Sequence, residues 1–223
     1  MFFGMCNSLA TFQAMMDEIF KKEIKGDLII VYMDDVLGFS KTLDGLKKIE
    51  RIVLEKAREH NLFFKAKKCE FRKQKIEYLG LVVQGGKLAI DLAKLNGILE
   101  WPTPKTVKEV RSFLGFGKFY SWFIKNFSHL AHALNNLLKK DKKFIRSNEC
   151  QESFDLLKKQ FMEEPVLMML DYAKPFQIQV DSSLFATRGI LTQMDTNGEH
   201  HPCAYLSKSL NKEQRNYDTG DRE

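Results

Sequence analysis

Residues 28–40 read Leu-Ile-Ile-Val-Tyr-Met-Asp-Asp-Val-Leu-Gly-Phe-Ser, and this stretch decides the fold. Two short runs rich in apolar and β-branched residues, 28–32 and 36–39, lie on either side of the acidic pair Asp34 and Asp35. β-Branched residues favour strands, whereas aspartates favour turns. The stretch therefore predicts two strands joined by a tight turn that carries two adjacent carboxylates.

Two carboxylates at one turn are candidates for binding divalent cations. Magnesium prefers oxygen ligands from carboxylates, phosphates and water. A pair of such ions can activate a 3′ hydroxyl and stabilise a leaving pyrophosphate. The alternative is an ordinary turn, because adjacent aspartates are common in turns. Residues 32–35 taken alone leave both interpretations open.

Helices and strands alternate around this hairpin. Apolar residues at helical spacing predict amphipathic helices over residues 9–25 and 42–60. Short strands are expected around residues 62–64, over 76–83 and over 88–90, with Gly85-Gly86 as a turn.

From Asp91 the apolar spacing becomes helical and predicts helices over 92–99, after Thr106, over 127–138 and over 148–161. Thr106 followed by Glu109 indicates a capping box. Residues 103–146 contain ten basic and two acidic residues. Such a segment suits contact with a polyanion, although a solvated helical surface is the alternative.

After Pro165 the pattern returns to strands. Residues 176–180 alternate between apolar and polar side chains, and further strands are expected over 184–194 and 202–207. Asn197-Gly198 is a typical hairpin turn between these two. A last helix is expected to begin near Thr219.

Composition places the chain among globular proteins, with 44% hydrophobic and 29% charged residues. It contains no apolar run of roughly 18 residues and no signal-peptide pattern at its N-terminus, so we expect an intracellular protein without membrane association. The spacing of the four cysteines predicts neither a disulfide framework nor a zinc site. Three possible metal ligands lie close together in the sequence: His200, His201 and Cys203. Their spacing does not match that of structural zinc sites, so we expect an exposed strand edge here and not a metal site.

Several blocks, in this order and spacing, resemble the reverse transcriptase of Ty3/gypsy-type retrotransposon polyproteins. Residues 31–40 resemble the polymerase motif, and residues 1–13 resemble the loop and helix under the incoming nucleotide and template. Residues 69–71 and 76–80 resemble the end of the palm and the hairpin that holds the primer terminus. Residues 101–115, with the aromatic pairs that follow, resemble the thumb. Residues 175–217 resemble the first three strands of the ribonuclease H domain.

The resemblance implies an α+β fold in three parts. Residues 1–90 are expected to form a partial reverse transcriptase palm, and residues 91–146 a helical thumb. Residues 147–223 are expected to supply a connection helix and the N-terminal, truncated part of a ribonuclease H-like β-sheet.

The resemblance also implies roles for individual residues. Catalysis and binding of Mg²⁺ (or Mn²⁺) are expected from Asp34, Asp35, Asp181 and Glu223. Gly4 is expected in the nucleotide-site loop. Contacts to nucleic acid are expected near the primer end, in the primer-holding hairpin and along the thumb: Tyr32, Met33, Leu79, Gly80, Lys105, Lys108, Arg111 and Lys118.

The implied partners are an RNA/DNA primer-template and the remainder of a polyprotein, namely its fingers, the rest of its ribonuclease H and its integrase. The family pattern places a third palm carboxylate before residue 1, so we expect no polymerisation by this chain alone. Two residues depart from the family pattern: Arg188 replaces a small residue, and Ser182 replaces the alanine after the aspartate. A residual nucleic-acid-binding module and an inert relic are the alternative functions.

Overall fold

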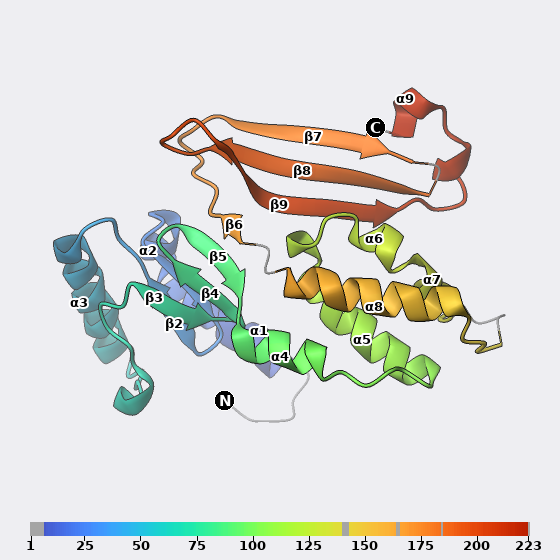
Figure 1. Ribbon diagram of the computed structural model, residues 1–223. Coiled ribbons are helices and arrows are strands. Elements are labelled where there is room, and N and C mark those ends of the chain that lie inside the picture. The colour runs from blue at the N-terminus through green and yellow to red at the C-terminus, as the bar shows by residue number, and fades with distance from the viewer. Residues whose placement is uncertain (1–6, 140–142, 164–165, 184, 223) are drawn as a thin grey trace. The chain divides into compact units, whose positions relative to one another are not determined.

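The computed structural model describes residues 7–139, 143–163, 166–183 and 185–222. Contacts within the chain divide it into two units, residues 1–74 and 75–223. Each unit surrounds a buried apolar cluster of its own. Figure 1 labels the helices and strands of both units.

The first unit packs three helices around one hairpin. The helices are α1 (Ser8–Ile19), α2 (Lys21–Lys25) and α3 (Leu43–Glu59). Strands β1 (Ile29–Tyr32) and β2 (Asp35–Gly38) pair antiparallel, as the sequence predicts. The core brings together the apolar faces of the helices and of β1: Met16, Phe20, Ile29 and Ile49.

Two predictions for this unit are wrong. The helix expected over 9–25 is broken at Phe20, because the ammonium of Lys56 on α3 binds the Ile19 carbonyl at 2.6 Å. The same ammonium pairs with Glu23 on α2 at 2.7 Å. The strand expected at 62–64 is not observed, and no described strand lies beside this segment as a pairing partner. The next regular element is the 3₁₀ helix η1 (Ala66–Lys68).

The second unit begins with a four-stranded antiparallel sheet. Its strands are β3 (Lys75–Tyr78), β4 (Leu81–Gln84), β5 (Lys87–Ile90) and the short β6 (Leu167–Met168). The single strand expected over 76–83 is therefore a hairpin that turns at Leu79 and Gly80. Contacts within the chain group β3–β5 with the helices that follow them. The expected boundaries between palm, thumb and ribonuclease H-like part, at residues 90 and 146, stay a prediction.

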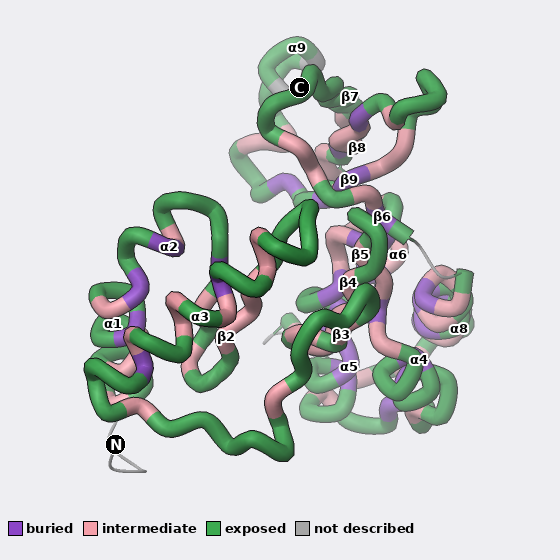
Figure 2. Tube along the Cα trace, turned by 90° about the vertical axis from the view of Figure 1, so that its left-hand side faces the viewer, coloured by how far each residue is buried: buried purple, intermediate pink, exposed green. Residues whose placement is uncertain are grey.

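The helices of this unit bury a large aromatic cluster. They are α4 (Leu92–Leu99), α5 (Val107–Phe119), η2 (Ser121–Phe123), α6 (Phe127–Leu130), α7 (His132–Asn136) and α8 (Asn148–Met162). Phe113 of α5 and Phe154 of α8 meet with ring centroids 4.7 Å apart. Buried positions, purple in Figure 2, recur along one face of α8.

The helix expected over 127–138 is in fact two short helices, with the break at Ala131. The hydroxyl of Ser153 on α8 donates to the Leu130 carbonyl at this point. A side chain that takes a helical carbonyl in this way interrupts the backbone ladder.

Three long strands follow: β7 (Phe176–Ser182), β8 (Ala186–Met194) and β9 (His200–Ser209). They form an antiparallel sheet in this order, which confirms the three predicted strands. β9 lies beside α6 (Figure 1), where Ser128 donates its backbone N–H to the Ser207 hydroxyl at 3.0 Å. The 3₁₀ helix η3 (Gln214–Asn216) and α9 (Thr219–Arg222) end the described chain. No described helix is both long and apolar enough to cross a membrane.

Candidate functional site

The β1–β2 hairpin carries the two candidate carboxylates. Tyr32 pairs with Asp35 across the strands, so Met33 and Asp34 form a two-residue turn. Met33 has a φ of +53°, a left-handed conformation that an unbranched side chain adopts at a steric cost. Both carboxylates are exposed at the end of the hairpin.

Gln13 of α1 fixes the conformation of this turn. Its side-chain oxygen accepts the Met33 backbone N–H at 2.6 Å, and its amide donates to the Val31 carbonyl at 3.2 Å. Gln13 is not among the site residues expected from the sequence. A signal was available, because Gln13 is a polar residue within the helical stripe of Leu9, Met16 and Phe20.

An apolar depression of about 370 Å³ lies beside the turn. Tyr32, with 55% of its surface exposed, forms part of its wall. The other lining residues come from α1, β1 and the turn: Leu9, Ala10, Gln13, Val31 and Met33. The hairpin thus presents two carboxylates next to an apolar depression.

Two aspartates supply only part of a metal coordination shell. Magnesium sites commonly use one or two carboxylates and complete the octahedron with phosphate oxygens and water. Within the described residues, no third histidine, cysteine or carboxylate joins Asp34 and Asp35. The residues present therefore fit a divalent cation that also binds groups from outside this part of the chain.

The β3–β4 hairpin is held by the C-terminal end of α5. Leu79 and Gly80 both have positive φ, +52° and +77°, which is the conformation of a tight hairpin turn. The Tyr120 hydroxyl donates to the Gly80 carbonyl at 3.3 Å. Burial, and next the charge of Asp91, raise the pKa of Tyr120 above its ordinary value. The two predicted hairpin residues are thus anchored to the basic helix.

Helix α5 separates its apolar and basic faces. Val110, Phe113 and Leu114 are buried in the aromatic cluster. Lys108, Arg111 and Lys118 are exposed, and their spacing of three and seven residues aligns them along the opposite face. Among the described residues, none of these three side chains forms an ion pair, so the stripe is available to an external anion.

The N-terminus of α5 follows the predicted capping pattern only in part. The Thr106 hydroxyl accepts the Glu109 N–H at 3.2 Å, as in a capping box. The Glu109 carboxylate, however, accepts the backbone N–H of Lys105 at 2.7 Å rather than that of Thr106. This hydrogen bond lowers the pKa of Glu109. The backbone of Lys105 is thereby fixed just before the basic stripe.

Asp181 lies near the end of β7, directly opposite Arg188 on β8. The carboxylate oxygen Oδ2 accepts two hydrogen bonds from that guanidinium, one from Nε at 2.6 Å and one from Nη2. Both side chains are about half exposed. The carboxylate that the family resemblance assigns to metal binding is therefore engaged by a cation of the chain itself.

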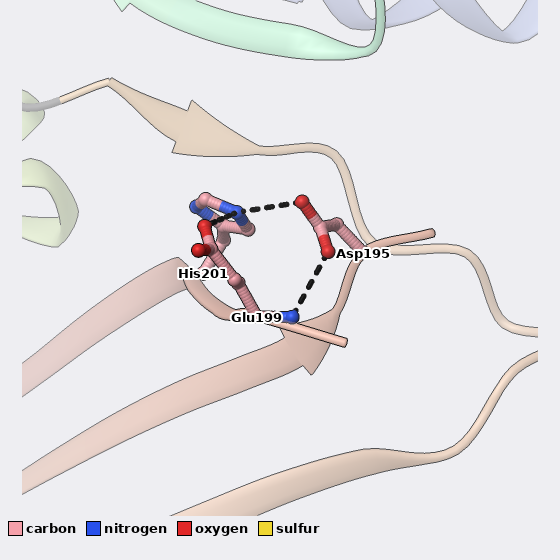
Figure 3. A group of neighbouring side chains, drawn as sticks. All are labelled: Asp195, Glu199 and His201. Carbon is pink, nitrogen blue, oxygen red and sulfur yellow. Dashed lines mark hydrogen bonds and ion pairs between the residues drawn. The ribbon is translucent and has the colours of Figure 1, made fainter. Parts of the chain in front are cut away.

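One turn gathers three groups that resemble metal ligands (Figure 3): Asp195, Glu199 and His201. Asp195 accepts the backbone N–H groups of Glu199 and Asn197 at 3.0 and 2.8 Å, and the first of these contacts is the main reason that its pKa is lowered. His201 Nε2 lies 3.0 Å from the same carboxylate. These contacts stabilise the β8–β9 turn and explain the cluster without a metal.

Comparisons with known proteins agree with these elements. Residues 1–83 match the family described as reverse transcriptase (RNA-dependent DNA polymerase). Residues 147–223 match the RNase H-like domain found in reverse transcriptase. The chain belongs to the reverse transcriptases of retrotransposon polyproteins. The family and the α+β fold expected from the sequence are thus confirmed.

Relatives of this reverse transcriptase chain are long polyproteins. It is 34% identical over 232 residues to the retrovirus-related Pol polyprotein from transposon opus of Drosophila melanogaster, and 31% identical over 221 residues to the transposon Tf2-3 polyprotein of Schizosaccharomyces pombe. Both matches cover 99% of the chain, but only 23% and 16% of the relatives. The chain therefore spans less than a quarter of the length of these relatives.

Solved reverse transcriptases share the fold. The foamy viral protease-reverse transcriptase in complex with an RNA/DNA hybrid matches the whole chain with a TM-score of 0.82 at 22% identity, over 30% of its own length. A foamy viral protease-reverse transcriptase structure with double-stranded DNA matches 98% of the chain, also at 0.82 and 22% identity, over 38% of its own length.

The described residues bring the predicted site residues of this reverse transcriptase into three groups. Tyr32, Met33, Asp34 and Asp35 share the β1–β2 hairpin; Leu79 and Gly80 share a turn fixed by Tyr120; Lys108, Arg111 and Lys118 follow α5. Lys105 lies just before α5, and Asp181 lies apart from these groups on β7. Gly4 and Glu223 lie outside the described residues. Their roles, and the functional roles of the other predicted residues, stay predictions.

Proposed function

We propose that this chain contributes the palm turn, primer-holding hairpin and thumb of an RNA-directed DNA polymerase within a retrotransposon polyprotein. The parent activity is metal-dependent DNA synthesis on an RNA or DNA template. The observation that carries the proposal is the hairpin whose turn Gln13 fixes, with Asp34 and Asp35 exposed at its end. The apolar depression beside Tyr32 supports it, since the face of a base at a primer end can stack on such a surface.

Reverse transcriptases in general depend on divalent cations, and in this chain Asp34 and Asp35 are the residues that would hold Mg²⁺ or Mn²⁺. The bound ions would lower the pKa of a 3′ hydroxyl and neutralise charge on the leaving phosphates. Two carboxylates position an ion only loosely, and catalysis depends on rigid positioning. We therefore expect no primer extension from the 223 residues alone, and propose the remaining polyprotein domains (fingers, the rest of ribonuclease H, integrase) as necessary partners.

Manganese broadening of backbone amide signals tests the metal role. With primer-template and a nucleoside triphosphate present, Mn²⁺ should broaden the Met33 and Asp35 signals of the isotope-labelled chain, and Asp34→Asn should reduce this broadening. Asp27→Asn is the matched control, because Asp27 is an exposed aspartate of the same unit with a left-handed φ of +51°. Equal broadening in the Asp34→Asn and Asp27→Asn variants would contradict the proposal.

Nucleic-acid binding through α5 is a second function that a specific observation favours. The unpaired stripe of Lys108, Arg111 and Lys118 has the spacing of a helix face that follows a phosphate backbone. Each phosphate contact contributes about 0.9 to the slope of log K against log salt on duplex DNA, so removal of all three should reduce the slope by about 2.7.

The chain offers a matched control for this triple alanine variant. Lys48, Arg51 and Arg58 are exposed on α3 with the same spacing of three and seven residues. Their replacement by alanine removes the same charge and should leave the slope nearly unchanged. An equal fall in both triple variants would show that net charge, and not the α5 stripe, determines binding.

An intracellular location, in the cytoplasm or the nucleus, is part of the proposal. Its support is that the three cysteines in the described residues, Cys69, Cys150 and Cys203, are all free thiols. Disulfides are rare where the cytosol keeps thiols reduced. For residues 147–223 the proposal is limited to a ribonuclease H-like sheet, because the surroundings of Asp181 do not fit a divalent cation.

A further inference from the structure

The end of β7 carries a charge arrangement opposite to that of a cation site. Asp181 Oδ2 accepts two of the five N–H donors of Arg188, which leaves three donors of the guanidinium for other partners. A divalent cation at this carboxylate has to displace the guanidinium or lie beside its positive charge. Displacement breaks the Asp181–Arg188 ion pair, and a cation beside the guanidinium is repelled by its charge. Both arrangements are therefore unfavourable.

A cavity of about 420 Å³ opens on the same face of the sheet. Arg188 and Asp181 line it from the strands, and Lys125 and Asn126 line it from the loop between η2 and α6. Two cationic and one anionic side chain therefore leave one net positive charge. Among the described residues, Lys125 forms no ion pair, so its ammonium is available to a ligand.

Asn126 adds an uncommitted polar group to the cavity. Its backbone has a left-handed φ of +60°, and its buried side-chain oxygen has no hydrogen-bond partner among the described residues. Buried polar atoms are nearly always hydrogen-bonded, so an exception in a cavity wall calls for an explanation. The unpaired Oδ1 is an acceptor and does not bind a phosphate oxygen, so the anion contacts in this cavity come from Arg188 and Lys125.

We propose that this cavity is a phosphate-binding site, in which Arg188 and Lys125 bind the oxyanion and Asp181 orients the guanidinium. Arginine donates in a planar fork that matches phosphate oxygens, and lysine adds a compact positive charge. The ligand is a backbone phosphate of a nucleic acid; this identification rests on the proposed function. Asp181 is then a positioning residue for Arg188 and not a metal ligand.

Amide signals of the intact, isotope-labelled chain provide the test. Inorganic phosphate should shift the signals of Asp181 and Gly189 saturably, and a short RNA/DNA hybrid should shift the same signals. Arg188→Ala and Lys125→Ala should each weaken the phosphate effect about tenfold, the loss typical of one charge-assisted hydrogen bond. Mn²⁺ should broaden these signals only in Arg188→Ala, where Asp181 is released.

Lys208→Ala is the matched control. Lys208 lies one register position from the Arg188–Ser207 pair, and neighbouring positions face opposite sides of a sheet, so its side chain lies away from the cavity. It should leave phosphate binding unchanged. Arg188→Lys should retain part of the binding, which separates loss of charge from loss of fold.

Three results would overturn the proposal: no saturable phosphate shift, equal weakening in Lys208→Ala, or Mn²⁺ broadening in the unmodified chain that Asp181→Asn abolishes. A response to inorganic phosphate but not to the hybrid would reject the nucleic-acid ligand. These results are distinct from a failure of the proposed polymerase role. That role is tested by Mn²⁺ broadening of the Met33 and Asp35 signals and by the salt dependence of nucleic-acid binding through α5.

Discussion

The side-chain oxygen of Gln13 lies 2.6 Å from the backbone nitrogen of Met33, and this single contact links helix α1 to the turn that carries the catalytic candidates. The same amide group donates to the Val31 carbonyl on β1. A turn with a left-handed Met33 is strained, and a side chain that binds the backbone on both sides compensates for this strain. The position of Asp34 therefore depends on a residue twenty-one positions earlier.

Replacement of Gln13 by leucine should release the turn. The loss of a part-buried hydrogen bond costs about 1 kcal/mol, which corresponds to roughly fivefold faster exchange of the Met33 amide hydrogen. Exchange monitored by NMR measures this directly. Gln13→Glu keeps the acceptor for Met33 but not the donor for Val31, so it should protect the Met33 amide better than leucine does. Equal exchange in all three chains would show that Gln13 does not hold the turn.

Replacement of Gly80 by alanine should destabilise the second unit more than the same change at Gly86. Both glycines have a φ near +76°, so both variants incur a cost of about 1–2 kcal/mol for a left-handed alanine. Only at Gly80 does the added methyl group meet an atom, the Tyr120 hydroxyl at 2.7 Å, whereas nothing lies within 4 Å at Gly86. Overpacking adds about 1–3 kcal/mol.

Urea unfolding followed by tryptophan fluorescence suits this comparison, because Trp101 and Trp122 both belong to the second unit. The difference between the two alanine variants isolates the contact with Tyr120, since the backbone cost is common to both. Equal unfolding midpoints would mean that the β3–β4 turn moves freely away from α5.

Local patterns predicted the β1–β2 hairpin, most helices and the three strands of the ribonuclease H-like sheet, because alternation, helical spacing and turn residues act over a few positions. Two helix breaks escaped prediction for a physical reason. The donors that interrupt the backbone ladders, Lys56 at Ile19 and Ser153 at Leu130, come from helices more than twenty residues away. Periodicity within a segment carries no information about such partners.

The candidate site shows the same limit. The aspartates were found from their turn and from family resemblance, whereas Gln13 and Tyr120, which hold the two hairpins, contact backbone atoms 20 and 40 residues away. Arg188 was noticed as a departure from the family pattern, but its effect on Asp181 follows only from the β7–β8 register. The phosphate cavity depends on a loop and a sheet that the sequence does not place together.

Ionisation of Tyr120 should weaken the second unit at alkaline pH. Burial raises the pKa of Tyr120 above its ordinary value of 10.0, so between that value and the folded pKa only the unfolded chain loses the proton. The stabilisation is complete below pH 10 and is lost as pH rises through the folded pKa. Tyr120→Phe should flatten this alkaline fall in part, because burial also raises the pKa of Tyr205.

The free energy of unfolding, measured with urea at a series of pH values from neutral to alkaline, gives the slope of stability against pH. Tyr172→Phe is the control, since Tyr172 is 87% exposed and its hydroxyl lies outside the buried cluster. An alkaline slope that is identical in the Tyr120→Phe and Tyr172→Phe variants would exclude Tyr120 as its source.

Gln193 should be essential for joining β7 to the segment before it. Its side chain is 1% exposed, accepts the Asp171 N–H at 2.8 Å and donates to the Asp171 carbonyl at 2.9 Å. The carbonyls of Lys174 and Pro175 also lie 3.2 Å from its amide nitrogen. Gln193→Leu removes these part-buried hydrogen bonds, and each contributes about 1 kcal/mol.

Gln177→Leu provides the comparison, because Gln177 is an exposed glutamine on β7 and its side chain forms no hydrogen bond with other described residues. We expect the Gln193 variant to lower the urea midpoint of the tryptophan transition and the Gln177 variant to leave it within error. Gln193→Glu separates the two contacts, since it keeps the acceptor for Asp171 but brings negative charge against three carbonyl oxygens. It should therefore be at least as unstable as the leucine variant, and greater stability would show that the amide donor contributes little.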